Sequence, residues 1–382
     1  MQMTPQPLTT CAACGNPATD KCSGCRSINY CGKFCQTTHW KSHKLTCEQR
    51  LLEKALSRVA ILVQKAYFDF SEQTFDTQII KVEECGDQWL IQDGDQQRKR
   101  TYFVKFPQHL MKNEQMKQAV LCAWKCNEAL GFLHQLLSGL LDGLNVKIEE
   151  VSITLGSVPR TIKIVNSDGF RLENWPTYMH EGLRITSTKT GKQYLFDFCG
   201  SQYGIHRALW KTPVYEAQFS AKIGKAYPFG THKHIFGILR NIKGIPRLTY
   251  GIVGDAAERL EMAIVAWEKK NRMPLSRIRS QNDVDFGKSE KELIETCRAA
   301  TSAFVEHNDF TAIFQDSIEY ARTHPGESGE LITRTFLCQD QEGFSMGIGV
   351  QMQSLQDRAL LQYNMPKDVL EKAQARLQEN GT

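Results

Sequence analysis

The sequence contains no long apolar run and no block of like charge. No stretch reaches the 18 or so uninterrupted apolar residues that a membrane-spanning helix requires. Residues 1–10 lack the basic and apolar regions of a secretory signal. The 47 basic side chains nearly balance the 42 acidic ones, and no internal repeat or low-complexity tract is present. These absences predict an intracellular protein without a membrane partner.

A disulfide framework is also missing, although the chain has thirteen cysteines. Seven of them lie within residues 11–47, and the other six are scattered without regular spacing. A cysteine cluster of this kind binds metal more readily than it oxidises in a reducing compartment, and both the cytosol and the nucleus fit.

The first 47 residues instead carry an alternation of cysteines typical of metal binding. Two Cys-x2-Cys knuckles are followed by two further cysteines, a histidine and a last cysteine. Zinc takes thiolate and imidazole ligands in fours, so eight such groups make two closed tetrahedral sites, which are structural rather than catalytic. The eight candidates are Cys11, Cys14, Cys22, Cys25, Cys31, Cys35, His43 and Cys47.

Spacing alone leaves the ligand pairing open. One arrangement places the first four cysteines on one ion and the remaining four groups on the other, and an interleaved arrangement is equally allowed. His39 lies four residues from both Cys35 and His43, so nine groups compete for eight positions.

The string from Cys22 to Cys47, CSGCRSINYCGKFCQTTHWKSHKLTC, resembles a MYND-type zinc finger. The resemblance implies the interleaved order and favours His43 over His39, which is then a solvent-facing helix residue. It places Cys11, Cys14, Cys31 and Cys35 on the first zinc ion and Cys22, Cys25, His43 and Cys47 on the second.

The same resemblance implies a shallow groove that binds a short proline-containing peptide of a partner protein in extended form. Ser23, Gln36 and Trp40 stand at the positions that line it. An indole offers a rigid apolar plate for a proline ring, and a carboxamide can pair with a peptide backbone. The alternative is that Trp40 packs inside the finger and Gln36 is only solvated.

Direct nucleic-acid binding by the finger is disfavoured by its charge. Residues 11–47 carry five basic side chains and one acidic one, while seven thiolates and two zinc ions together contribute a net −3. The metallated finger therefore has a charge of about +1, which lacks the strong positive field of a nucleic-acid reader.

The rest of the chain predicts a mixed α+β body. We divide the sequence into a finger over 11–47, a connecting amphipathic helix over 48–66 and an α+β domain over 67–382. Alternating residues in 77–106, with a turn at Asp93-Gly94, indicate an antiparallel ribbon, and 114–141 indicate one long helix. Short strands follow within 146–198, and helices near 255–270, 289–322 and 366–378.

The segment 175–204 holds the best candidates for chemistry in the body. Strands on either side of a turn at Thr190-Gly191 place His180 and Asp197 next to each other. The arrangement is similar to transglutaminase-like members of the papain superfamily, which implies a nucleophilic cysteine on the preceding helix. Cys122 takes that role, with Cys126 as the less favoured substitute and Gln202 as a polar neighbour.

Several features weigh against an active thiol enzyme. A nucleophilic cysteine is best placed at a helix N-terminus, whereas Cys122 and Cys126 both lie inside the predicted helix. A His–Asp pair across a hairpin also occurs for purely structural reasons. The string at 200–204, GSQYG, resembles a motif of fungal MYND-finger proteins, which implies an inactive descendant of that fold.

Methyl transfer of the SET-MYND type is disfavoured, because only ten residues precede Cys11 and the body lacks an Asn-His string. The sequence thus favours a zinc-dependent protein-interaction adaptor in a regulatory or transcription-related assembly. A thiol enzyme using Cys122, His180 and Asp197, or its inactive descendant, is the alternative.

Overall fold

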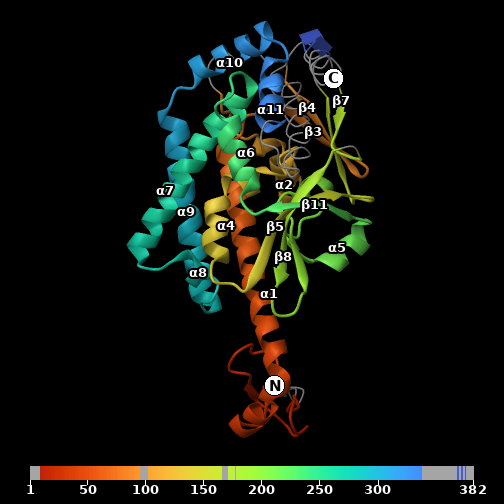
Figure 1. The fold of residues 1–382 in the computed structure, drawn as a ribbon, viewed down its shortest axis with the longest axis vertical. Helices are drawn as coiled ribbons and strands as arrows, with labels where there is room; N and C mark the ends of the chain where they lie inside the picture. The colour runs from red at the N-terminus through yellow and green to blue at the C-terminus, as the bar shows by residue number, and fades with distance from the viewer. Residues whose placement is uncertain are drawn as a thin grey trace. The chain divides into compact units, whose positions relative to one another are not determined.

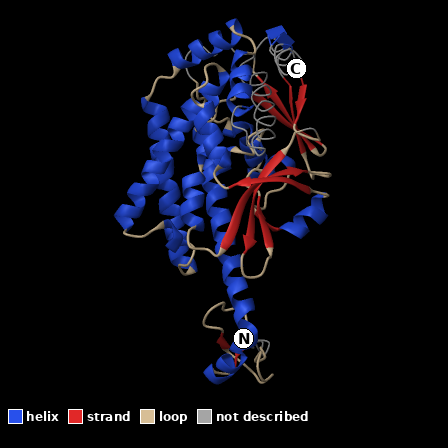
Figure 2. Cartoon of the chain, in the orientation of Figure 1, coloured by secondary structure: helices blue, strands red, loops and turns tan. Residues whose placement is uncertain are grey.

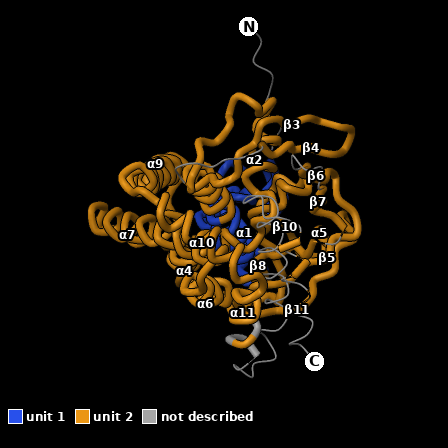
Figure 3. The backbone as a smooth tube through the Cα atoms, turned by 90° about the horizontal axis from the view of Figure 1, so that it is seen from above, with its two compact units in different colours: residues 1–59 blue, residues 60–382 orange. Residues whose placement is uncertain are grey.

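A computed structural model describes residues 9–94, 102–165, 171–176 and 178–337, together with Asp368, Val369, Glu371, Lys372 and Ala375. The chain divides into two compact units, residues 1–59 and 60–382 (Figure 3). Helices and strands both occur in quantity, and the predicted α+β class is confirmed (Figure 2). In the described part of the chain, no helix is long and apolar enough to cross a membrane.

The first unit consists of two short strands and the beginning of a long helix. Strands β1 (Asp20–Lys21) and β2 (Asn29–Tyr30) pair antiparallel, with Asp20 opposite Tyr30. Its small core consists of buried cysteines with Ala18 and Tyr30. A core of this size supplies little burial energy, which leaves folding dependent on metal.

Among the described residues, helix α1 (Lys33–Gln73) is the longest element, at 41 residues (Figure 1). It contains the helix expected at 48–66 but begins earlier, inside the finger. Its later turns place Leu56, Val63 and Tyr67 in buried positions at helical spacing. The division between the two units falls within this helix, between Val59 and Ala60.

The second unit contains a five-stranded antiparallel sheet (Figure 1). The strand order is β10-β9-β8-β5-β11. The bounds are β5 Val146–Thr154, β8 His180–Ser187, β9 Gln193–Phe196, β10 Leu209–Lys211 and β11 Lys222–Pro228.

Alternate residues of this sheet face two different helices. Val151 and Ile153 of β5 pack with Tyr215 and Phe219 of α5 (Thr212–Phe219) in one apolar cluster. Glu150, which points to the opposite face, instead contacts α6 (Thr231–Leu239). Both faces of β5 and β8 are therefore covered, which explains why the start of β8 is buried at successive residues.

A second sheet has the order β3-β4-β6-β7, with β4 and β6 parallel. Its strands are β3 Ile79–Cys85, β4 Gln88–Asp93, β6 Thr161–Val165 and β7 Arg171–Glu173. The predicted ribbon turn at Asp93-Gly94 is wrong, because the hairpin turns at Gly86, whose φ of 65° is left-handed. Residues 102–106 of the predicted ribbon form no strand.

The single long helix predicted for 114–141 is also wrong. The structure has α2 (Glu114–Cys122), α3 (Glu128–Phe132) and α4 (His134–Leu141), with a break over residues 123–127. Trp124 interrupts the helix with a φ of 55°, a conformation that a bulky L-residue adopts only when its surroundings enforce it. The apolar stripe continues through the break, which is why periodicity did not reveal it.

The remaining helices follow the sheet. The predicted helices near 255–270 and 289–322 correspond to α7 (Val253–Asn271) and to the pair α9 (Asp283–His307) and α10 (Thr311–Thr323). Most of the helix predicted near 366–378 lies outside the described residues. The other helical elements are η1 Gln108–Leu110, η2 Gly200–Tyr203, η3 Arg247–Ile252, α8 Leu275–Ile278 and α11 Glu327–Leu337.

Candidate functional site

The zinc-ligand candidates of the finger gather into two groups of four. The first cluster is Cys11, Cys14, Cys31 and Cys35, and the second cluster is Cys22, Cys25, His43 and Cys47; within each, the ligand atoms lie within 4.8 Å of one another. The interleaved order is therefore confirmed and the sequential one is wrong. Each cluster takes one knuckle and two later ligands, so the two sites interleave along the same short segment.

The spacings within the clusters fit a tetrahedral zinc ion. Zinc–sulfur bonds of about 2.3 Å predict sulfur–sulfur edges of about 3.8 Å in a tetrahedron. In the first cluster, the Sγ atom of Cys14 lies 3.6 Å from that of Cys31 and 3.7 Å from that of Cys35. In the second, the Sγ atoms of Cys22 and Cys47 are 3.9 Å apart. Four sulfur atoms, or three with an imidazole nitrogen, suit structural zinc and leave no open position.

The sulfur atoms of the first cluster lie so close together that several thiolates repel one another unless a cation is bound. The Cys31 thiol raises the pKa of Cys35 to about 12. Burial would raise the pKa of Cys11, but backbone N–H groups of Cys31, Ala13 and Cys14 outweigh it and lower that pKa to about 6. Without a cation, the thiols of this cluster therefore lose their protons at very different pH values. A divalent ion at the centre removes this conflict, because it stabilises all four thiolates together.

The second cluster contains His43 and not His39, as the resemblance implied. The Nε2 atom of His43 lies 3.5 Å from the Sγ of Cys25. His39 is half-buried and its Nδ1 hydrogen bonds to the Tyr30 hydroxyl at 3.0 Å, while its ring stacks on that of His43. His39 therefore supports the ligand from outside the cluster and does not simply face solvent.

The second cluster is more enclosed than the first. Cys22, His43 and Cys47 are buried, whereas in the first cluster only Cys11 is. Gly24 lies against it, since a Cβ atom at that position would come 2.9 Å from the Sγ of Cys47. Residue 24 must therefore lack a side chain for this cluster to close.

The three candidate peptide-binding residues lie beside the second cluster. Gln36 donates its Nε2 proton to the Ser23 hydroxyl at 2.7 Å and approaches the Sγ of Cys22 at 3.9 Å. Trp40, four residues further along α1, keeps 39% of its surface exposed and sets its indole edge-on to His43. The sequence predicted these residues as a group, and the structure places all three next to ligands of one zinc site.

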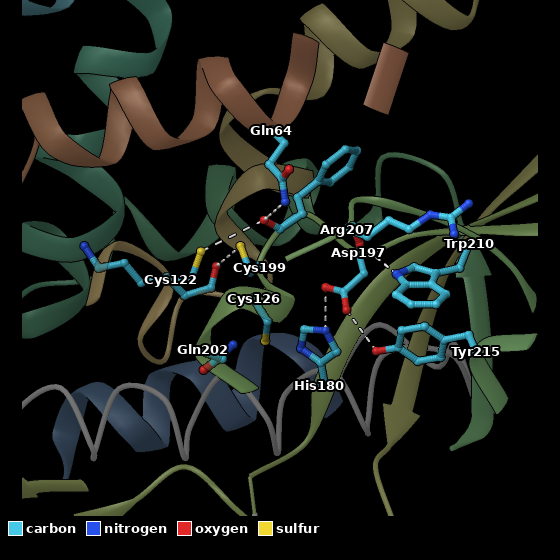
Figure 4. A network of polar contacts seen from close by, with 12 residues as sticks. Gln64, Cys122, Cys126, His180, Asp197, Cys199, Gln202, Arg207, Trp210 and Tyr215 are labelled. Carbon is cyan, nitrogen blue, oxygen red and sulfur yellow. Dashed lines mark hydrogen bonds and ion pairs between the residues drawn. The ribbon is translucent and has the colours of Figure 1, made fainter. Parts of the chain in front are cut away.

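In the second unit, His180 and Asp197 meet as the hairpin predicts. The Nε2 atom of His180, at the start of β8, lies 2.8 Å from the Oδ1 of Asp197, which follows β9 (Figure 4). The Tyr215 hydroxyl of α5 donates to the second carboxylate oxygen at 2.9 Å. His180 and Asp197 are fully buried, so this pair is held rigidly and away from water.

Cys122, the nucleophile implied by the resemblance, is the last residue of α2. Its Sγ points at the Phe198 carbonyl, 4.0 Å away, and no contact between its thiol and His180 is among those of the described residues. Cys126 instead lies in the break before α3, with its Sγ 3.8 Å from the carbonyl of Met179, the residue that precedes His180. The unpredicted helix break decides which of the two thiols faces β8.

A buried histidine between two carboxylates was not predicted at all. The Nδ1 atom of His232 in α6 lies 2.6 Å from the Oε2 of Glu150 on β5, and its Nε2 lies 2.9 Å from the Oε2 of Glu181 on β8. The first contact is an aligned hydrogen bond, and the second is an ion pair with poorer alignment. Burial alone would lower the pKa of His232, but the two carboxylates outweigh it and raise the pKa to about 10.

Comparison with known proteins identifies the finger. Residues 11–47 match the family model of the MYND finger. A 39-residue segment is 54% identical to Ubiquitin carboxyl-terminal hydrolase 19 of Arabidopsis thaliana, covering 10% of this chain and 6% of that protein. A 41-residue segment is 46% identical to Protein CBFA2T2 of Homo sapiens, covering 11% of this chain and 7% of that protein.

The chain thus spans less than a tenth of the length of these relatives, and no solved structure matches it. The family match and the two ligand clusters confirm the predicted zinc-binding MYND finger, which is a protein-interaction module.

Proposed function

Because residues 11–47 form a MYND finger, we propose that this protein is a zinc-dependent adaptor that captures short proline-containing segments of partner proteins. The observation that carries the proposal is the exposed indole of Trp40, held against a zinc ligand beside an oriented carboxamide. The partner segment lies extended across this surface, and the assembly it joins is regulatory or transcription-related.

Trp40 supplies the apolar contact. A tryptophan on a helix normally turns its ring into a core, but here 39% of the side chain is open to solvent. Its ring centroid lies 6.2 Å from that of His43 at an angle of 73°. Because a zinc ligand holds the indole, little side-chain entropy is lost when a proline ring stacks on its open face.

Gln36 and Ser23 supply the polar contacts. The bond from Gln36 Nε2 to the Ser23 hydroxyl fixes the carboxamide orientation, and among described residues no donor reaches its Oε1. That oxygen is therefore available to accept an N–H of the peptide backbone. Gln36 and Trp40 lie four residues apart on α1, so the apolar plate and the acceptor are neighbours on one helix face.

The test is peptide binding by the zinc-loaded full chain. A library of proline-containing ten-residue peptides is compared with the same peptides carrying alanine in place of proline, using calorimetry. Trp40→Ala removes the stacking surface and is expected to weaken binding at least about tenfold, since buried aromatic anchors contribute 2 kcal/mol or more. Both zinc ions should remain, because Trp40 is not a ligand.

Phe34→Ala is the matched control. Phe34 is also an aromatic residue of α1, is 83% exposed, and points to a different side of the helix from Trp40. It should leave affinity unchanged. The proposal fails if Trp40→Ala binds as tightly as the unmodified protein, or if alanine-substituted peptides bind as well as those with proline.

A further inference from the structure

Three basic side chains of the finger are exposed around the peptide-binding surface proposed above. They are Arg26, Lys33 and Lys44. Within the part of the chain that the structure describes, none of the three forms an ion pair with an acidic side chain. Their positive charges are therefore available to a ligand.

Two of these cations lie on the stripe of α1 that carries Gln36 and Trp40. Counted from Lys33, the residues Gln36, Trp40 and Lys44 follow at intervals of three, seven and eleven. These intervals return to one face of a helix with 3.6 residues per turn. Trp40 therefore has one lysine about two turns before it and another about one turn beyond it.

Arg26 ends the knuckle that carries Ser23. Its φ is 53°, and its backbone N–H donates to the carbonyl of Cys22 at 3.0 Å. This left-handed conformation suits glycine, because a side chain there crowds the backbone. The knuckle would close more easily with glycine at this position, so the stability of the turn does not explain the arginine.

Lys33 also departs from a local rule. It is the first residue of α1, and the first turn of this helix contains no acidic side chain. A helix N-terminus carries partial positive charge, so a further cation is unfavourable there. Sequences depart from such rules most often at functional sites. The departures at Arg26 and Lys33 both add positive charge beside the same surface.

The second zinc cluster does not neutralise these cations. Its three thiolates and one zinc ion leave a single negative charge, and Cys22, His43 and Cys47 are buried. The first cluster, with four thiolates, carries the larger share of the negative charge of the finger. The surface around Trp40 therefore presents a positive potential to a ligand, although the finger as a whole is nearly neutral.

We propose that the captured partner segment carries Asp or Glu side chains on both sides of its proline, and that these carboxylates contact the three cations. This inference rests on the proposed peptide binding and names the chemical class of the partner. Exposed ion pairs contribute little each, so the cations select among proline-containing segments while Trp40 supplies most of the affinity.

The helix sets the spacing of the acidic residues. Lys33 and Lys44 are eleven residues apart on α1, which corresponds to about 17 Å, or about five residues of an extended chain. A segment that runs along α1 with its proline on Trp40 therefore places the acidic side chains about two residues from the proline on one side and about three on the other.

Four peptides of equal length test this partner class by calorimetry with the zinc-loaded full chain. They combine proline or alanine at the centre with glutamate or glutamine at the flanking positions. At low salt, we expect the proline peptide with glutamate flanks to bind at least about fivefold more tightly than the one with glutamine flanks. The difference should shrink at about 1 M salt, where the Debye length is about 3 Å.

The outcomes separate the two proposals. Equal affinity of the two proline peptides would overturn the acidic partner class and leave proline capture intact. Equal affinity of the proline and alanine peptides, or no binding by any of the four, would overturn both. A ten-nucleotide single-stranded DNA is the competing polyanion, and its displacement of the glutamate-flanked peptide would also count against an acidic peptide as the occupant.

Arg26→Gly removes a charge without disturbing the turn. It should keep both zinc ions, because glycine adopts this conformation freely, yet weaken the glutamate-flanked peptide about two- to fivefold and leave the glutamine-flanked one unchanged. Lys44→Gln should act in the same way. An arginine and a lysine with only structural roles would leave the ratio of the two affinities unchanged, which would overturn the proposal.

Lys41→Gln is the matched control. Lys41 is also an exposed lysine of α1, but it lies about 100° around the helix from Trp40. Its substitution removes the same charge and should change either affinity less than about twofold. A loss equal to that of Lys44→Gln would mean that the peptide responds only to total charge, and the assigned contacts would be wrong.

Discussion

The buried His232 predicts a strong dependence of stability on alkaline pH. Its imidazole lies between Glu150 and Glu181, with all three side chains no more than 3% exposed. Burial opposes the charged ring, but the Glu181 and Glu150 carboxylates more than compensate and raise the pKa of His232 from 6.5 to about 10. At high pH the ring loses its proton, and the positive charge that stabilises the two buried carboxylates is lost.

The size of the effect follows from linkage. A folded-state pKa of about 10 against an unfolded value of 6.5 corresponds to about 5 kcal/mol in the free energy of unfolding. Because the folded-state pKa is the higher one, this contribution is fully present below pH 6.5 and is lost as the pH rises towards 10. We expect a loss of about 1.4 kcal/mol per pH unit, or about 3 kcal/mol by pH 9.

Cys126 and Tyr227 also face Glu181, and burial raises the pKa of both. Neither therefore competes with His232 as the pH approaches 9. The assay is urea unfolding of the zinc-loaded chain between pH 6.5 and 9, with the imidazole protonation of His232 followed by NMR. An imidazole that titrates with a midpoint near 6.5 would refute the reasoning, whatever the stability curve shows. His232→Gln should remove the slope, because glutamine does not titrate.

Three further predictions follow from the finger and from the second unit. A chelator should remove zinc in two phases, first from the more exposed first cluster and then from the second, and a single release of both ions would contradict this order. Gly24→Ala should cost the finger one zinc ion, because the added Cβ would lie 2.9 Å from a ligand sulfur. Gly32→Ala is the control: its Cβ meets no atom within 4 Å, so metal analysis should still find two zinc ions. Asp76→Ala should lower the free energy of unfolding by about 3–5 kcal/mol, because it leaves the buried Lys125 ammonium without its carboxylate. A loss under about 1 kcal/mol, measured by denaturant unfolding, would count against that ion pair.

The finger could be predicted from the sequence almost completely, because its information is local. Ligand type and spacing narrow the ligands to nine candidate groups, and the resemblance supplies their pairing and the choice of His43 over His39. Spacing could not predict the hydrogen bond between His39 and the Tyr30 hydroxyl. That bond forms because the folded finger brings the β1–β2 hairpin alongside α1.

The second unit could be predicted only where contacts are short in sequence. The His180–Asp197 pair follows from one hairpin and was expected. The break at Trp124 depends on Gln202, 78 residues away, whose side chain bonds to the Trp124 backbone. The contact of His232 with Glu150 joins residues 82 apart and carries no local signal. Tertiary contacts overrode the helical pattern at 123–127, so the sequence could not predict that Cys122 ends α2 while Cys126 lies in the break.

Helix α1 gives the metal a role in the order of folding. Cys35, His43 and Cys47 all belong to it, so zinc binding fixes its first turns. Starting a helix is the unfavourable step, and each later residue adds at little cost. The same helix continues to Gln73 and carries buried residues such as Tyr67 and Phe70. We therefore expect zinc to act as a nucleus for this helix, so that metal supply during synthesis sets how quickly the α1 residues of the second unit become helical.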